Sequence, residues 1–336
     1  MERPLFGEAG SALNLLCLLC FLVAIRSSGL SFMYSFSTCW NSHRHTDGRL
    51  MLREIRELGF DHAELSHGTR ISLLPGIIEA VEAGEIKISS LHNFCPLPLG
   101  VNNSAPNLYR LSAEKPAERD SAYRYTRKTI EMAGRLKAPL VVIHYGSMEM
   151  KDYTDKLMEL LVRGEKESPK YQKLCAEVQK KREAIKEPYI DRANELLKRV
   201  LPLAEELGVK LGIENREGLE ELPLESDFSL LFKVLASPAA VYWHDLGHAQ
   251  IKENLGFIDH AFHLESQRDR LYGFHIHDVQ FPGRDHCAPG TGTVDFAGLK
   301  RSVKPGHLKV FEFSPMMPAE EALKGIAHVK NIWGPE

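Results

Sequence analysis

The chain has 336 residues, of which 43% are hydrophobic and 26% are charged, with a formal net charge of -3. This is the composition of a globular protein, long enough for one large α/β barrel or two smaller domains. The weakly acidic balance gives no general attraction to nucleic acid or anionic lipid, so neither is an expected partner. Beyond the first segment the cysteines show no zinc-type or disulfide-framework spacing, which is typical of free thiols in a reducing compartment.

An apolar run at residues 12–25 precedes the first expected strand. It is too short for a comfortable membrane span, so no stable membrane insertion is expected. Its length suits the core of a signal peptide, but the residues before it carry Glu2, Arg3 and Glu8 and lack a net positive charge. Three interpretations remain: a weak export signal within residues 1–29, a membrane-proximal anchor, or an extension upstream of a working start at Met33. We favour the last, which predicts a cytoplasmic protein with an N-terminal extension at 1–32 and a barrel domain at 33–336.

From residue 33 onward, strand-like and helix-like segments alternate to the end of the chain. The expected strands are short and mostly apolar, as are strands buried on both faces: 34–37, 61–65, 86–92, 140–144, 209–214, 240–245, 271–277 and 308–313. The expected helices between and after them are 48–58, 71–83, 117–136, 190–207, 227–235, 258–270, 295–303 and 319–329. Eight strand–helix repeats imply parallel pairing through right-handed crossovers. The count of eight predicts a single (β/α)₈ TIM barrel instead of an open doubly wound sheet, whose glycine-rich first turn is absent here.

Two of the connections between expected strands are long. Residues 93–116 are rich in Pro and Asn, which predicts an irregular loop over the barrel mouth. Residues 147–188 are mostly charged but carry apolar residues at helical spacing, which predicts a helical insertion after the fourth strand. A solvated helix pair is the simpler interpretation of this insertion, and a cap over the site or a homo-oligomer contact is the alternative.

Acidic and imidazole side chains end four of the later strands. Glu214, Asp245, His275 and Glu312 occupy positions whose side chains can all point into the barrel, because residues i and i+2 share one face of a strand. In such barrels active sites lie at the carboxyl ends of the strands. Three converging carboxylates would repel one another by ~4 kcal/mol per close pair at a surface-like dielectric. A bound divalent cation is the simplest way to remove that repulsion.

Other polar residues gather at the same ends of the expected strands. One histidine at a strand end is more often structural than a ligand, but polar residues at six successive strand ends favour a site. Candidates for additional metal or substrate contacts are His92, His144, His248 and His286. Candidates for substrate contacts alone are Trp40, Glu64, His67, Trp243 and Arg284, although barrel-core packing explains the two tryptophans equally well.

Five motifs occur in one order along the second half of the chain. They are Leu-Gly-Ile-Glu-Asn at 211–215, Asp-Leu-Gly-His at 245–248, Phe-His-Ile-His-Asp at 274–278, Asp-His with Pro-Gly-Thr-Gly at 285–292, and Phe-Glu-Phe at 311–313. In this order they resemble the xylose isomerase-like barrel superfamily, and within it the sugar (phosphate) isomerases and epimerases. The resemblance implies that Glu214, Asp245, His275 and Glu312 hold one divalent metal, and that the two glutamates are the acid/base pair.

The residue types fit that chemistry. A metal bound through oxygen and nitrogen polarises a carbonyl and its neighbouring hydroxyl, which stabilises an enediolate, while one carboxylate removes a proton and the other returns it. Such ligands suit Mn²⁺, Mg²⁺, Co²⁺ or Zn²⁺. Three neighbouring residues, Asn215, His277 and Asp278, are expected to orient the ligands. We therefore expect isomerisation or epimerisation of a small sugar, sugar phosphate or related hydroxy-ketone, with a related lyase left open.

Two other functions remain as alternatives. The apurinic endonucleases of the same superfamily use three zinc ions, and most of their ligands have matches here, but Arg284 stands where an aspartate is expected and Asp285 is displaced by one position. A guanidinium cannot ligate a metal, which argues against the third ion. The other alternative is a non-catalytic sugar-binding barrel, against which the two intact glutamates, Glu214 and Glu312, argue.

Overall fold

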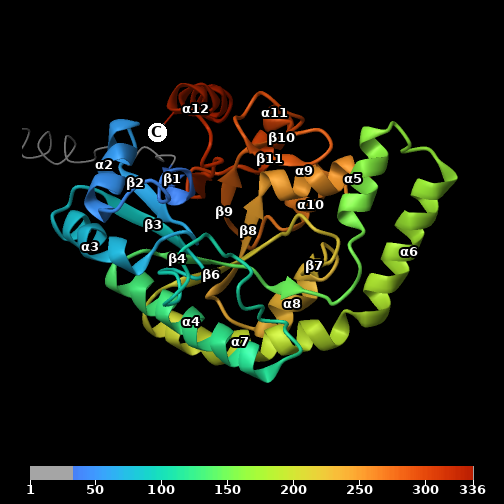
Figure 1. Cartoon of the computed structure of the whole chain (residues 1–336), viewed down its shortest axis with the longest axis horizontal. Coiled ribbons are helices and arrows are strands. Elements are labelled where there is room, and N and C mark those ends of the chain that lie inside the picture. The colour runs from blue at the N-terminus through green and yellow to red at the C-terminus, as the bar shows by residue number, and fades with distance from the viewer. Residues whose placement is uncertain (1–32, 336) are drawn as a thin grey trace, which may run out of the picture. The chain divides into compact units, whose positions relative to one another are not determined.

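The structure is a computed structural model that describes residues 33–335, so the expectations for the N-terminal extension concern residues outside the described range. Eight parallel strands close a barrel in the order β1-β12-β9-β8-β6-β4-β3-β2, and helices surround it (Figure 1). The barrel strands are β1 (Tyr34–Ser37), β2 (His62–Leu65), β3 (Lys87–His92), β4 (Leu140–Ile143), β6 (Lys210–Glu214), β8 (Ala240–Asp245), β9 (Leu271–Ile276) and β12 (Leu308–Phe311). The predicted (β/α)₈ barrel is confirmed, and each strand lies where the sequence placed it.

Helices cover the outside of the barrel and follow their strands along the chain. They are α2 (Gly48–Glu57), α3 (Leu74–Glu82), α4 (Pro116–Arg135), α7 (Glu187–Glu206), α8 (Phe228–Leu235), α9 (Leu246–Asn254), α10 (His260–Ser266), α11 (Phe296–Leu299) and α12 (Ala319–Trp333). Short 3₁₀ turns occur as η1 (Thr38–Trp40), η2 (Ile71–Leu73) and η3 (Lys300–Ser302). Apart from α9, these helices correspond to predicted segments.

Helix α9 follows β8 where no helix was predicted. It begins directly after the strand, and Asp245 caps it by accepting a hydrogen bond from the backbone N–H of His248 at 2.8 Å. Nearly every residue of α9 is buried, so the segment lacks the alternation of apolar and polar faces by which surface helices are recognised. His248 consequently projects from a rigid first helical turn.

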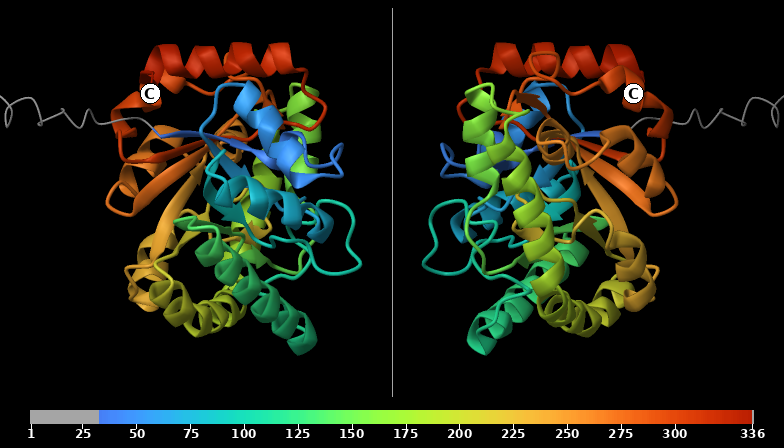
Figure 2. Two further views of the ribbon diagram at one scale, coloured as in Figure 1. Left: turned by 90° about the vertical axis from the view of Figure 1, so that its left-hand side faces the viewer. Right: turned by 90° about the vertical axis from the view of Figure 1, so that its right-hand side faces the viewer.

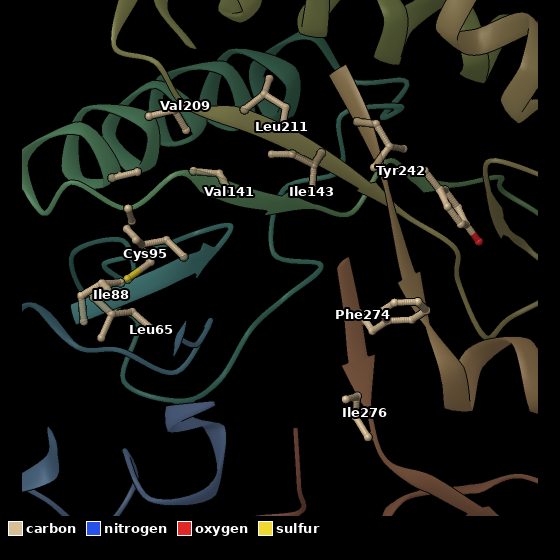
Figure 3. Close-up of a cluster of buried hydrophobic side chains, with 14 of the residues drawn as sticks. Leu65, Ile88, Cys95, Val141, Ile143, Val209, Leu211, Tyr242, Phe274 and Ile276 are labelled. Carbon is tan, nitrogen blue, oxygen red and sulfur yellow. The ribbon is translucent and has the colours of Figure 1, made fainter. Parts of the chain in front are cut away.

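Two apolar layers hold the barrel together. A small inner cluster fills the barrel below the site and includes Leu140, Val142, Trp243 and Val310. A much larger outer cluster lies between the strands and the helices, and Figure 3 shows some of its side chains on successive strands. Because side chains alternate along a strand, the residues next to the inner set point outward and the inner face remains free for the polar strand ends.

The predicted helical insertion is confirmed as α5 (Thr154–Val162) and α6 (Pro169–Ile185), which lie beside the barrel in Figures 1 and 2. Apolar residues of both helices pack with Ile251 of α9 and with Leu255, which directly follows it. The hydroxyl of Tyr171 on α6 also donates to the carbonyl of Leu255 at 2.8 Å. The insertion thus contacts the helix that carries His248. Among the described residues, no helix combines the length and apolar character needed to cross a membrane.

Two short antiparallel pairs lie between the barrel elements, at the carboxyl-end loops. Strand β5 (Gly146–Ser147) pairs with β7 (Glu221–Leu222), and β10 (Asp278–Gln280) pairs with β11 (Arg284–Cys287). The first pair brings the loop after β6 next to the loop after β4. The second forms a hairpin over β9, with an irregular register between its strands. Both pairs fix loops that would otherwise lack regular hydrogen bonds.

Candidate active site

The imidazole of His275 lies at the centre of three carboxylates. Its Nδ1 is 2.6 Å from an oxygen of Glu214, 3.1 Å from one of Glu312 and 3.6 Å from one of Asp245. All four side chains are buried, and each comes from the end of a different neighbouring strand. Ligand atoms that each lie about 2.1 Å from one divalent ion would be separated by roughly 3 Å. The four groups that the sequence singled out therefore form a set whose spacing and chemistry fit a single metal ion.

Glu64 fixes the orientation of His275 from the other side of the ring. Both of its carboxylate oxygens lie near Nε2 of His275, at 3.2 and 3.1 Å, and a carboxylate can only accept there. Glu64 is itself held by the hydroxyls of Ser37 at 2.9 Å and Ser90 at 2.8 Å. Such a carboxylate commonly sets the tautomer of a metal-binding histidine. Since Nε2 donates its proton to Glu64, Nδ1 is the nitrogen of His275 that would bind a metal ion at the centre.

Asp245 is held in place by the residues expected to orient the ligands. The side chain of Asn215 accepts from the backbone N–H of Asp245 at 2.8 Å and donates to its carbonyl at 2.9 Å. Nε2 of His277 lies 3.0 Å from the Asp245 carboxylate, while Nδ1 accepts from the backbone N–H of His286 at 3.0 Å. His277 therefore carries its proton on Nε2 and donates it to Asp245.

Asp278 acts on the loop that follows the hairpin. Its carboxylate accepts from the backbone N–H groups of Gly290 and Gly292, both at 2.9 Å, and from that of Val294 at 3.0 Å. At Gly292 any larger residue would place its Cβ 2.4 Å from the Asp278 carboxylate. The Pro-Gly-Thr-Gly motif thus wraps around a buried carboxylate, and Asp278 positions the loop instead of touching the site.

A cavity of about 490 Å³ opens above the four central groups. This volume lies within the usual range for small-molecule sites. Glu214 and Glu312 line the cavity, whereas Asp245 and His275 are not among its lining residues. The long loop after β3 borders it through Asn102, Asn103, Ser104 and Pro106, which confirms the predicted loop over the mouth. Only the two glutamates of the central set therefore reach the space that a substrate would occupy.

The surroundings of the two glutamates shift their pKa values in opposite directions. Burial raises the pKa of Glu214, but its contacts with His144 and His275 outweigh burial and hold the pKa well below the ordinary value. For Glu312, burial dominates and raises the pKa, with Glu64 and Glu214 adding to the effect. A pair of carboxyl groups whose pKa values are separated in this way suits one proton acceptor and one proton donor.

Comparison with known protein families identifies the fold. A family model described as "Xylose isomerase-like TIM barrel" matches residues 52–331, which is most of the chain. The chain belongs to this family. No match was found among curated protein sequences.

Solved structures with the same xylose isomerase-like fold include several sugar epimerases. A D-tagatose 3-epimerase-like protein superposes with a TM-score of 0.63 at 18% identity, covering 89% of this chain and 96% of its own. The E. coli 3-keto-D-glucoside 4-epimerase gives 0.62 at 13% identity, covering 90% and 100%. The IOLI protein with a bound zinc atom gives 0.61 at 15% identity, covering 89% and 99%. At these identities the likeness establishes the fold alone.

The expected additional ligands form a second group beside the central set. His92, His144 and Glu214 present ligand atoms that lie within 4.8 Å of one another, and all three line the cavity. His248 stands on the other side of Asp245, with Nδ1 3.5 Å from its carboxylate. His67 also lines the cavity, and its Nδ1 contacts the hydroxyl of Ser104 in the long loop. In this xylose isomerase-like barrel the predicted histidines therefore do come together.

The β10–β11 hairpin presents Asp285, and not Arg284, to the cavity. Arg284 is exposed, contacts Gln280 and is not among the residues that line the cavity, so the structure does not place it as a substrate contact. Asp285 lines the cavity instead and pairs with Nδ1 of His286 at 2.9 Å. Neighbouring strand residues normally face opposite ways, but a φ of 52° at His286 turns both side chains inward. The carboxylate that the sequence analysis considered missing is therefore present.

Three further expected substrate contacts lie outside the cavity. Trp243 is completely buried in the inner barrel cluster, edge-on to His275, and Trp40 donates to the carbonyl of Met317 at 2.8 Å. Glu64 lies beneath His275, as described above. None of the three lines the cavity. Their positions fit packing for the tryptophans and orientation of His275 for Glu64.

The sequence analysis did not single out Arg216. This side chain is only 4% exposed and its guanidinium lies among Glu214, His144 and His248. The signal was present, because Arg216 follows Glu214 by two positions and so returns to the same side of the chain. Because the strand-end rule was used to find acids and histidines as metal ligands, it passed over Arg216.

Proposed function

We propose that this protein is a divalent-metal-dependent isomerase or epimerase of a small sugar or related hydroxy-ketone. The observation that carries the proposal is the convergence of Glu214, Asp245 and Glu312 on Nδ1 of His275. Of these four residues, Glu214 and Glu312 line the cavity. Carboxylate and imidazole ligands of this kind suit Mn²⁺, Mg²⁺, Co²⁺ or Zn²⁺. The sugar epimerases among the structural neighbours are consistent with this chemistry.

In the proposed reaction the chain moves one proton next to a carbonyl. When bound, the metal supplies a Lewis acid that polarises the carbonyl and its neighbouring hydroxyl. The low pKa of Glu214 keeps it ionised, so it can remove the proton, and the raised pKa of Glu312 suits it to deliver one. Delivery to the opposite face of the same carbon gives an epimer, and delivery to the neighbouring carbon gives an isomer. The two glutamates exchange roles in the reverse direction.

The cavity supports a small polar substrate. Most of its lining residues are polar, and they include Asn102, Asn103, His67, Arg70 and Ser314. Hydroxyl groups of a sugar require donors and acceptors of this kind, because a buried hydroxyl without a partner costs roughly 1–3 kcal/mol. The volume of about 490 Å³ would accommodate a monosaccharide and ordered water.

The direct test measures proton exchange. Purified protein loaded with Mn²⁺ or Co²⁺ would be incubated with a panel of ketoses and ketose phosphates in deuterated water, and deuterium at the carbon beside the carbonyl would be followed by NMR. We expect exchange on at least one ketose and none after removal of the metal. Absence of exchange across the panel, with the metal demonstrably bound, would refute the proposal.

One observation keeps the apurinic endonuclease-like alternative in view. Glu217, His248 and Asp285 form a further group of ligand atoms within 4.8 Å of one another, and Asp245, His248 and His277 form another. These groups offer more ligands than one metal needs. Binding of about three zinc ions per chain together with cleavage of abasic duplex DNA would favour this alternative over the sugar isomerase.

A further inference from the structure

Arg216 occupies the space between the residues of the second ligand group. Its Nη1 donates to Glu214 at 2.8 Å and to Nε2 of His144 at 2.9 Å, and it lies 3.3 Å from Nδ1 of His248. On the other side, its Nε donates to Glu221 at 3.1 Å, on the strand that pairs with β5. The guanidinium is thus fixed at both ends and almost completely buried.

The histidines around Arg216 are oriented as metal-binding histidines are. Nδ1 of His92 lies 3.0 Å from the carbonyl oxygen of Asn93, which can only accept, so the proton of His92 is on Nδ1. Nδ1 of His144 lies 2.9 Å from the side-chain oxygen of Asn107, which gives the same tautomer. Nε2 of His144 also lies 2.8 Å from Glu214, but it accepts from Arg216, which can only donate. Both rings therefore carry a lone pair on Nε2. Outer hydrogen bonds of this type hold histidine ligands in place at metal centres.

The lone pair of His144 and the Glu214 carboxylate face a cation of the chain itself, Arg216. In the described residues, the group of His92, His144 and Glu214 has the donors of a metal site, yet Nη1 of Arg216 already lies within 3 Å of two of them. A guanidinium is permanently charged and has no lone pair to offer a metal. Its N–H groups bind the same lone pairs that a metal ion would bind. Its positive charge also repels a second cation.

We propose that Arg216 takes the place of a second metal ion and restricts this barrel to one metal. His92, His144 and Glu214 are then a latent site for a transition-metal ion such as Zn²⁺ or Co²⁺, which becomes available when the guanidinium is removed. The inference rests on the proposed function only in that both assign Glu214 to a metal-binding centre. It accounts for a chain that keeps many ligand-type histidines around a single central metal site.

The test counts metal ions in the full-length protein without any substrate. Wild-type protein and the Arg216→Ala variant would be dialysed to equilibrium against Co²⁺, with the ion measured by elemental analysis and its environment by visible absorption. We expect one tightly bound ion per chain in the wild type and two in Arg216→Ala. The second ion is expected to bind the variant at least 100-fold more tightly than it binds the wild type.

Three matched variants locate the effect. Arg216→Lys retains a cation and is expected to keep one ion. Arg216→Ala combined with His144→Ala removes a ligand of the latent site and is expected to return to one ion. His144→Ala alone is expected to leave the single ion of the wild type in place.

Two results would overturn the inference. One is a wild-type chain that binds two or more ions tightly, with loss of an ion on His144→Ala. The other is a folded Arg216→Ala variant that still binds one. If Arg216→Ala does not fold, Arg216→Gln, which also lacks the charge, takes its place and is held to the same count of two ions. Because no substrate is present, failure of the sugar chemistry would leave these counts unchanged.

Discussion

The two faces of strand β8 bury the same types of residue in opposite electrostatic settings. The side chain of Asp245 points to the inner face, where it meets His275 and His277. His244, one residue earlier, points to the outer face and lies among Tyr242, His260 and neighbouring helices. Both histidine groups are buried, but only the inner group contains carboxylates.

The outer group forms a hydrogen-bond chain in which every ring is neutral. His260 donates from Nδ1 to the side-chain oxygen of Gln250 at 3.2 Å, so its Nε2 accepts from Nε2 of His244 at 2.9 Å. Nδ1 of His244 then accepts from the hydroxyl of Tyr242 at 2.8 Å, and that oxygen accepts from Nε2 of His263 at 2.9 Å. Each N–H or O–H group in this chain donates to one acceptor. An added proton would occupy an accepting nitrogen, so two donors would then face each other.

Carboxylate partners distinguish His275 from the buried histidines of the outer group. Burial lowers the pKa of His260 to about 3 and that of His263 to about 4, because no carboxylate contacts either ring. Burial acts on His275 in the same direction, but Glu312 and Glu64 outweigh it and raise its pKa well above the ordinary value. The site around His275 therefore holds positive charge, and the sites around His260 and His263 exclude it.

The largest effect is expected when either of the two glutamates around His275 is replaced. Glu214→Gln and Glu312→Gln should each lower the rate of proton exchange on a responsive ketose by ~10²–10⁴, because each removes one acid/base group. Circular dichroism should show an unchanged barrel. Full activity in either folded variant would contradict the assignment, and Glu54→Gln, at a half-buried site outside the cavity, serves as the matched control.

Removal of the metal should have the next largest effect. A ligand present at 100 times its dissociation constant stabilises the folded state by about 2.7 kcal/mol. Chelator-treated protein should therefore unfold at lower temperature, and readdition of Mn²⁺ or Co²⁺ should restore the midpoint. Asp245→Asn should show a much smaller metal-dependent shift than the wild type. An identical shift in both would place the metal elsewhere.

The outer histidine chain predicts acid sensitivity. Unfolded histidine has a pKa of about 6.5, so below that pH the unfolded state binds more protons than the folded state. The outer histidines therefore contribute fully to the free energy of unfolding above pH 6.5. That contribution should fall by ~2 kcal/mol per histidine as the pH is lowered from 6.5 to 5. Urea unfolding at these pH values measures it.

A variant of the chain tests the source of the acid sensitivity. His260→Gln should reduce the pH dependence by about one histidine's share, whereas His328→Gln, which replaces an exposed histidine, should leave it unchanged. An equal pH dependence in the wild type and His260→Gln would rule out the outer chain as the cause.

The smallest effect is expected at Arg284. Because it is exposed and lies outside the cavity, Arg284→Ala should change stability by less than about 0.5 kcal/mol and leave proton exchange unchanged. Asp285→Asn should reduce exchange more, since it removes the partner of His286, whose pKa is lowered by burial but raised to about 10 overall by that hydrogen bond. A strong effect of Arg284→Ala with none of Asp285→Asn would reverse this order.

Part of the site was predictable because side chains two positions apart on a strand lie on the same face. Short apolar runs identified the eight strands, and the i, i+2 rule brought Glu214, Asp245, His275 and Glu312 to one end of the barrel. The same rule separated the inner face from Ile213 and Phe274, which pack in the outer layer. The metal-ligand role of these residues stays a prediction.

The sequence by itself determined the barrel and the set of polar strand ends, because both depend on patterns of two to four neighbouring residues. Only the tertiary structure decided which polar residues share a space. Glu64 reaches His275 from 211 positions away, Asp285 enters the cavity through one left-handed residue, and Arg216 meets His144 across two loops held by a short sheet. Such contacts depend on backbone turns and on how loops pack, and the spacing of residues along the chain does not predict either.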